Sequence, residues 1–214
     1  MRELRAALVV EGPSDAWFLP RVLTRALDAI CRSESVDVEV REVGVLPIRR
    51  GGGLVEGVCV AAGECLDDLF FYHYDGGANS VKAERQYWEP LAAAWRQVPG
   101  GRELVPVVPV REMEAWALAD PVALRNVIGV AWSKRDVFWG DRPGDVEKLD
   151  DPKGKLQKIS DGGRSGRRRA RHPEEYLPLL AAEVSLEVLR DVPSFRQWST
   201  DTVEALRKMR FLPW

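Results

Sequence analysis

The sequence predicts an α/β fold in which helices flank a mainly parallel sheet, followed by an α-helical C-terminal extension. Two observations indicate this fold. Residues 6–10, 69–74 and 104–110 form short apolar runs, which are typical of strands buried on both faces. Segments with a helical spacing of apolar residues alternate with these runs, and such alternation favours parallel strands joined by right-handed crossovers.

The first helix is expected directly after residues 6–10. Ser14 is a candidate N-cap, Asp15 falls in the first turn, and apolar residues then recur every three or four positions. Pro20 lacks a backbone hydrogen-bond donor, so we expect the regular helix to begin or bend there. Residues 36–43 alternate between apolar and polar, which predicts a strand with one solvent-exposed face.

The middle of the chain continues the alternation of strands and helices. Residues 54–66 are compatible with a helix, and Asn79 or Ser80 is expected to cap the helix that follows the second apolar run. The third apolar run contains Pro106 and Pro109. Because proline cannot donate a backbone hydrogen bond, this run is expected to be irregular or to have an unpaired side.

The C-terminal part of the chain has a different character. Residues 112–120 are expected to be helical, but residues 133–171 are rich in Lys, Arg, Gly and Asp, which predicts a loop-rich region. Pro173 suits the first position of a helix, and a last helix is expected over residues 194–209. Helices therefore dominate the end of the chain.

The composition is that of a globular protein. Of the 214 residues, 45% are apolar and 30% are charged, so collagen, coiled-coil and disordered classes are excluded. The formal net charge is −2, so a nucleic acid would have to bind to a local basic patch. The first apolar run is too short for a secretory segment or a membrane span, so we expect a cytoplasmic protein that does not contact a membrane.

Cysteine and histidine residues do not predict a zinc site. Cys31, Cys59 and Cys65 lack CxxC spacing, and His73 and His172 lie far apart in the sequence. We interpret the cysteines as buried thiols in a reducing compartment. His73 lies inside the second apolar run, and we interpret it as a packed core residue rather than a general base.

An acidic residue follows each of the three apolar runs within two positions, namely Glu11, Asp75 and Glu112. The carboxyl ends of parallel strands meet at one edge of the sheet, where open α/β folds bind ligands. Carboxylates gathered there raise one another's pKa unless a cation lies between them, and Mg²⁺ (or Mn²⁺) prefers oxygen ligands. Asp15 and Glu114 could complete the set. The alternative is that each acid simply favours the start of a helix.

These motifs carry a resemblance to a known family. Residues 10–15, VEGPSD, resemble the first motif of the Toprim domain, the metal-binding fold of topoisomerases, primases and OLD-family nucleases, and Asp75 resembles the acid of its second motif. The chain is also similar, over nearly its whole length, to an uncharacterised Toprim-like bacterial family often encoded beside AAA-type ATPases in defence-related loci. The segments that carry this similarity are residues 10–15, residues 73–75, residues 109–116 with Asp120, residues 151–153 and residues 193–195.

The resemblance implies a role for particular residues. The implied Mg²⁺ ligands are Glu11, Asp15, Asp75 and Glu114, with Glu112 as an additional candidate. Lys153 would contact the negative charge of phosphate. The resemblance implies that Glu11 and Lys153 are the catalytic residues. Gly77 stands where typical Toprim domains carry a second acid, and this departure puts a second metal ion in question.

The resemblance also implies a domain organisation and a function. Residues 1–130 would form a Toprim-like metal-binding domain, and residues 131–214 a basic loop region with C-terminal helices packed on it. The implied activity is Mg²⁺-dependent hydrolysis of nucleic acid, with DNA favoured over RNA, alongside an AAA-type ATPase and in anti-phage defence. The alternatives are a non-catalytic Toprim-like subunit of an ATPase complex and a small-molecule phosphohydrolase.

Basic residues gather between positions 153 and 171, interleaved with Gly and Ser, and could follow a phosphate backbone. Their alternative interpretation is a solvated loop balanced by neighbouring acids. The candidate nucleic-acid contacts are Lys153, Lys155, Arg164, Arg167, Arg168, Arg169 and Arg171.

Overall fold

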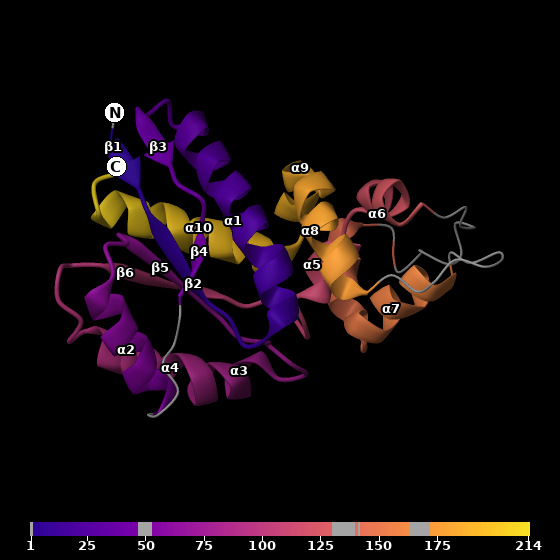
Figure 1. The fold of residues 1–214 in the computed structure, drawn as a ribbon, viewed down its shortest axis with the longest axis horizontal. Coiled ribbons are helices and arrows are strands. Elements are labelled where there is room, and N and C mark those ends of the chain that lie inside the picture. Colours follow the sequence, from indigo (N-terminus) through magenta and orange to yellow (C-terminus); the bar gives the residue numbers. More distant parts are fainter. Residues whose placement is uncertain (1, 47–52, 130–139, 141, 163–171) are drawn as a thin grey trace.

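The computed structural model describes residues 2–46, 53–129, 140, 142–162 and 172–214 (Figure 1). It confirms the expected α/β fold with parallel strands, flanking helices and C-terminal helices. A parallel four-stranded sheet has the order β4-β2-β5-β6, and β1 pairs with β3 in a separate parallel pair. The strands are β1 (Arg2–Leu4), β2 (Ala6–Val9), β3 (Val38–Val40), β4 (Gly44–Val45), β5 (Leu69–His73) and β6 (Glu103–Val107).

The two central strands are the most apolar ones. Every residue of β2 and β5 is buried, as expected for parallel strands covered on both faces. Strand β6 pairs with β5 alone among the described strands, and its Pro106 is tolerated because an edge strand has an unpaired side. The register places Val9 opposite Tyr72 and His73 opposite Val107. The carboxyl ends of β2, β5 and β6 therefore lie next to one another.

Helix α1 (Pro13–Ser33) begins earlier than the sequence indicated. Gly12 is its N-cap residue and Pro13 its first residue, so the expectation that Ser14 caps the helix is wrong. The helix does not begin at Pro20, which lies inside it. The helix continues through Pro20 although this residue has no backbone N–H. The Thr24 hydroxyl donates a hydrogen bond to the Pro20 carbonyl (2.7 Å).

The helices cover the two faces of the sheet in different ways. Figure 1 shows α2 (Leu54–Glu64), α3 (Ser80–Ala83) and α4 (Glu89–Trp95) together on one side and α1 on the other. A π-helical turn, η1 (Glu84–Trp88), joins α3 to α4, and the Asn79 side chain caps α3 as expected. Each face has its own hydrophobic cluster.

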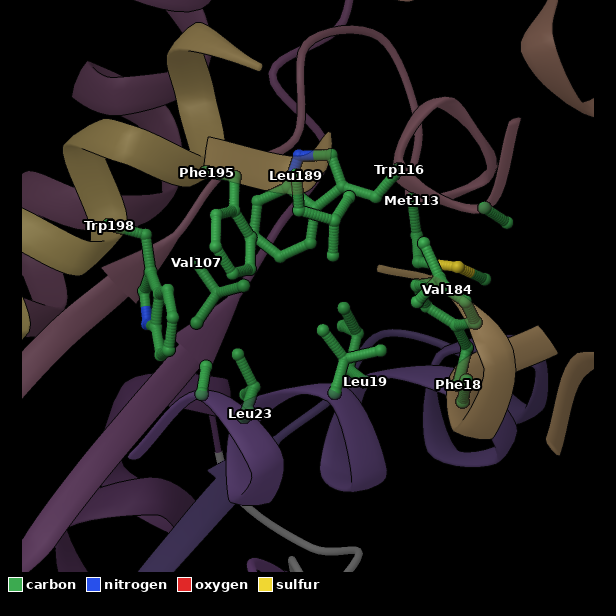
Figure 2. Close-up of a cluster of buried hydrophobic side chains, with 14 of the residues drawn as sticks. Phe18, Leu19, Leu23, Val107, Met113, Trp116, Val184, Leu189, Phe195 and Trp198 are labelled. Atoms are coloured by element: carbon green, nitrogen blue, oxygen red, sulfur yellow. The ribbon is translucent and has the colours of Figure 1, made fainter. Parts of the chain in front are cut away.

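The larger cluster joins the first and last parts of the chain. Figure 2 shows Leu19 and Leu23 of α1 facing Val107 of β6 and the aromatic rings of Trp116 and Phe195. Helix α8 (Pro173–Glu183) packs against α1, and α10 (Pro193–Lys208) packs against β6. This part of the chain also contains α5 (Glu114–Leu118), α6 (Pro121–Ile128) and α9 (Leu186–Arg190).

The expectation of a loop-rich region over residues 133–171 is wrong in part. The structure contains a 3-10 helix, η2 (Pro143–Lys148), and an α-helix, α7 (Pro152–Gly162). Few apolar residues are enough to hold them, because Val146, Leu156 and Ile159 are all buried in the larger cluster. None of the described helices is long and apolar enough to cross a membrane.

Candidate functional site

The acids singled out in the sequence lie where the parallel strands end. Glu11 follows β2 and precedes α1, Asp75 follows β5, and Glu112 and Glu114 lie between the end of β6 and the first turn of α5. The first turn of α1 contributes Asp15. Because the three strands are adjacent and parallel, the structure brings these five acids to one edge of the sheet.

The charges of these acids influence one another. Burial raises the pKa of Asp75 to about 6, and the negative charges of Glu11, Asp15 and Glu112 add to this shift. Burial likewise raises the pKa of Glu114 to about 7, with Glu112 and Asp15 contributing. Burial also raises the pKa of Glu11. Glu11 is exposed and Asp75 is half-buried, whereas Asp15 and Glu114 are buried. The protein itself therefore compensates the negative charge at this edge only in part.

Asp15 differs from the other acids. Burial alone would raise its pKa, but contact with His73 and a hydrogen bond from the Gly12 backbone N–H (2.8 Å) hold the pKa below its usual value. The carboxylate thus has two roles. It accepts the hydrogen bond from the Gly12 N–H in the capping box of α1, and it also faces the other acids. Its position is therefore fixed by the start of the helix.

The turn after Asp75 is pinned to the segment that carries Glu112. The Gly76 backbone N–H donates to the Pro109 carbonyl (3.1 Å), and the Gly77 N–H donates to the Arg111 carbonyl (3.3 Å). A Cβ atom at Gly76 would lie 3.1 Å from the Pro109 carbonyl oxygen, which is tighter than ordinary contact. Gly77 has a φ of 56°, a left-handed conformation that favours glycine. Glycine at position 77 therefore meets a backbone requirement of this turn.

Glu112 is already engaged with the protein. Its Oε2 atom accepts a hydrogen bond from the Lys153 backbone N–H (3.0 Å) at the start of α7, where Asp151 Oδ1 accepts from the Gly154 N–H (2.7 Å). The two carboxylates therefore bind the first amides of α7, which suits negative charge at a helix N-terminus. This hydrogen bond holds the backbone of Lys153 near the acids. The positive charge of Lys153 acts to lower the pKa of both Asp15 and Glu114.

The donor set suits a hard cation, although the side chains do not already enclose one. Among the residues that the structure describes, no three His, Cys, Asp or Glu side chains are grouped closely enough to hold a metal ion. One buried oxygen nevertheless lacks a hydrogen-bond partner within the described chain, namely Asp75 Oδ1. A buried oxygen without a partner is costly unless a ligand satisfies it, and carboxylate oxygens are the ligands that Mg²⁺ prefers. The residues therefore fit a divalent cation by their chemistry.

The sequence interpretation of His73 was incomplete. The side chain is buried, with 1% of its surface exposed, but its Nε2 atom lies 3.5 Å from Asp15 Oδ1 and 3.7 Å from Asp75 Oδ1. Burial alone would lower its pKa, but the nearby carboxylates of Asp15 and Asp75 raise it. A signal was present in the sequence. His73 and Asp75 are two residues apart at a strand end, a spacing that places both side chains on one face.

The candidate nucleic-acid contacts are described only in part. Lys153 and Lys155 lie in α7, with the first exposed and the second half-buried. The remaining candidates, Arg164, Arg167, Arg168, Arg169 and Arg171, lie outside the described residues.

Comparison with known proteins gives a family but no characterised relative. No curated protein and no solved structure matches the chain. One family model matches residues 10–201, which include the candidate site and most of the C-terminal helices. The chain therefore belongs to the family described as a domain of unknown function, DUF4276.

Proposed function

We propose that the protein is a Mg²⁺-dependent nuclease of Toprim-like type that hydrolyses phosphodiester bonds in nucleic acid. One observation carries the proposal. Glu11, Asp75 and Glu114 come from three separate parts of the chain, yet they share one edge of the sheet, and burial raises the pKa of each. A cation at this ligand-binding edge would offset the charge of the acids there, two of which, Asp15 and Glu114, are buried.

The candidate residues would bind the cation, contact phosphate and orient water. Glu11, Asp15, Asp75 and Glu114 would hold the ion, and Glu112 would contribute less because it accepts the Lys153 amide. A bound divalent cation would supply an activated water and neutralise charge on the phosphoryl group. The exposed Lys153 side chain is placed to meet phosphate, while Glu11 would orient the water. No side-chain nucleophile is required.

The same proposal extends to the partners. Lys153 and Lys155 on α7 would contact the nucleic-acid backbone, with DNA favoured over RNA, and the arginines between positions 164 and 171 are further candidate contacts by their charge. Action with an AAA-type ATPase in anti-phage defence rests on the Toprim-like resemblance alone. A cytoplasmic location rests on the shortness of the first apolar run.

Replacement of Glu11 tests the nuclease. We expect Glu11→Gln to lower Mg²⁺-dependent cleavage of labelled DNA by at least about 100-fold, because electrostatic and metal-holding groups contribute on this scale. Glu204→Gln, which removes an exposed carboxylate on α10, is the matched control and should cleave at the wild-type rate. Wild-type activity in Glu11→Gln would show that the site is assigned wrongly.

A non-catalytic subunit is the second candidate function, and Gly77 favours it. Without an acid at this position, the second motif has one carboxylate fewer than a typical Toprim domain, by the resemblance stated above. Calorimetric titration separates the two functions. The nuclease requires uptake of Mg²⁺ or Mn²⁺ that is lost in Asp75→Asn, and the binding subunit requires no such uptake.

A further inference from the structure

His73 is held in one orientation at the candidate site. Its ring is buried in β5, and its Nδ1 atom lies 2.9 Å from the Val107 carbonyl oxygen on the neighbouring strand. A carbonyl oxygen can only accept a hydrogen bond, so Nδ1 must carry the hydrogen. In the neutral ring, Nε2 then has a free lone pair. Histidines that bind metals typically donate their other ring N–H to a backbone carbonyl or a carboxylate in this way.

The free nitrogen points at the acids of two different motifs. Nε2 lies 3.5 Å from Asp15 Oδ1 and 3.7 Å from Asp75 Oδ1. Bonds of about 2.1 Å from one ion to nitrogen and oxygen ligands place neighbouring ligand atoms roughly 3.0–3.5 Å apart. The first separation lies at the upper limit of this range and the second, at 3.7 Å, exceeds it. The three side chains are not yet grouped closely enough to hold an ion, so binding one would draw the carboxylates toward Nε2. Asp75 Oδ1 is also one of the buried side-chain atoms that lack a hydrogen-bond partner among the described residues.

We propose that His73 is a direct ligand of the cation at this site, together with Asp15 and Asp75, and that the site therefore prefers a first-row transition ion such as Mn²⁺ to Mg²⁺. Mg²⁺ takes oxygen ligands almost exclusively, whereas imidazole nitrogen suits transition ions. The inference rests on the proposed function insofar as that function requires a cation here. It does not depend on whether the bound ion cuts nucleic acid.

A rival arrangement uses the same atoms. If Nε2 carries a hydrogen as well, the ring is a cation that pairs with Asp15 and Asp75 and keeps metal ions away. The two arrangements predict opposite changes in metal affinity when the His73 ring is removed. Loss of a ligand weakens binding of the transition ion, whereas loss of a competing positive charge strengthens binding of every divalent cation.

Calorimetric titration of the full chain with MnCl₂ and MgCl₂ distinguishes them. His73→Asn keeps an N–H for the Val107 carbonyl but removes Nε2, and we expect it to weaken Mn²⁺ binding by at least about tenfold with a much smaller change for Mg²⁺. His73→Gln offers an amide oxygen in place of the nitrogen and should shift the preference toward Mg²⁺. Unchanged or tighter Mn²⁺ binding in His73→Asn would overturn the inference.

Spectroscopy gives a readout that needs no variant at position 73 to fold. The chain has two histidines, His73 and the exposed His172. Electron spin-echo modulation from imidazole ¹⁴N should appear in the Mn²⁺-loaded wild type and persist in His172→Gln. A wild type that binds Mn²⁺ without this modulation would show that His73 is not a ligand.

The outcomes separate the inference from the nuclease proposal. Imidazole modulation without cleavage of nucleic acid leaves the ligand assignment standing and overturns the nuclease. Metal-dependent cleavage with equal affinity for both ions and no modulation does the reverse. Absence of any metal uptake by the wild type overturns both.

Discussion

Helix α5 contributes two buried side chains, Trp116 and Glu114, to surroundings of different character, one aromatic and one acidic. On one side, the Trp116 ring packs against Phe195 and Trp198, and its indole N–H donates to the Ser194 hydroxyl (2.8 Å). On the other, Glu114 is 6% exposed, and burial raises its pKa to about 7. The Trp116 N–H is therefore satisfied within the chain, although Trp198 Nε1 beside it has no hydrogen-bond partner among the described residues. The Glu114 carboxyl is instead a buried acid that a ligand could satisfy.

Substitutions in the two regions are therefore expected to change the free energy of unfolding in different directions. A fully packed region contributes to the free energy of unfolding, so substitutions there destabilise the fold. A region of buried carboxylates opposes folding in the absence of a ligand, so neutralising one of them should stabilise the metal-free protein while weakening ligand binding. The two effects have opposite signs although the residues are two positions apart.

The largest expected effect is in the aromatic region. Trp116→Ala should lower the free energy of unfolding by about 3–5 kcal/mol, because a large buried ring leaves a cavity and Ser194 loses its partner. Chemical denaturation measures this change. Trp214→Ala is the control, since Trp214 is 88% exposed, and should leave stability unaltered. A loss below about 1 kcal/mol for Trp116→Ala would mean that the region is loosely packed.

An opposite and smaller effect is expected in the acidic region. The folded-state pKa of Glu114 lies above its ordinary value of 4.5, so the folded protein binds this proton more tightly than the unfolded chain. The stabilisation is therefore present at low pH and is lost as pH rises from about 4.5 to about 7. Glu114→Gln should raise the free energy of unfolding of the metal-free protein at pH 8 by roughly 1–3 kcal/mol.

Denaturation at two pH values checks this sign. The gain from Glu114→Gln should be present at pH 8 and should shrink at pH 4, where the wild-type carboxyl is protonated in both states. The exposed acid Glu204 provides the control, because Glu204→Gln should show no such pH-dependent gain. If Glu114→Gln destabilises the protein at pH 8, its carboxylate is engaged in a favourable contact and the contrast between the two regions fails.

The sequence predicted the secondary structure and the acidic region by different routes. Apolar periodicity indicated the strands and most helices, because the apolar residues on the buried face of an element recur with the period of that element. The meeting of Glu11 and Asp75 followed from a rule about parallel strands rather than from spacing in the chain. Both routes use short-range patterns, and both led to features that the structure contains.

Other features depended on contacts that the local sequence does not encode. Helix α7 lies in a segment of polar composition, and its first turn is held by the carboxylate of Glu112, about forty positions earlier in the chain. The orientation of His73 depends on the Val107 carbonyl of the next strand. A segment can therefore look like a loop, and a histidine like a core residue, when its decisive partner is distant in sequence.

The smallest expected effect tests whether backbone strain keeps the acidic region as it is. Gly77 has a φ of 56°, so Gly77→Asp, which restores the acid of the Toprim pattern, should lower the free energy of unfolding by only about 1 kcal/mol. Gly101, with a φ of 61° and open space around it, is the matched control, and Gly101→Asp should show the same loss. If strain is the whole cost, the two variants agree in metal-free protein. A much larger loss for Gly77→Asp would mean that repulsion from the neighbouring carboxylates dominates, and added Mg²⁺ should then recover stability in that variant but not in Gly101→Asp.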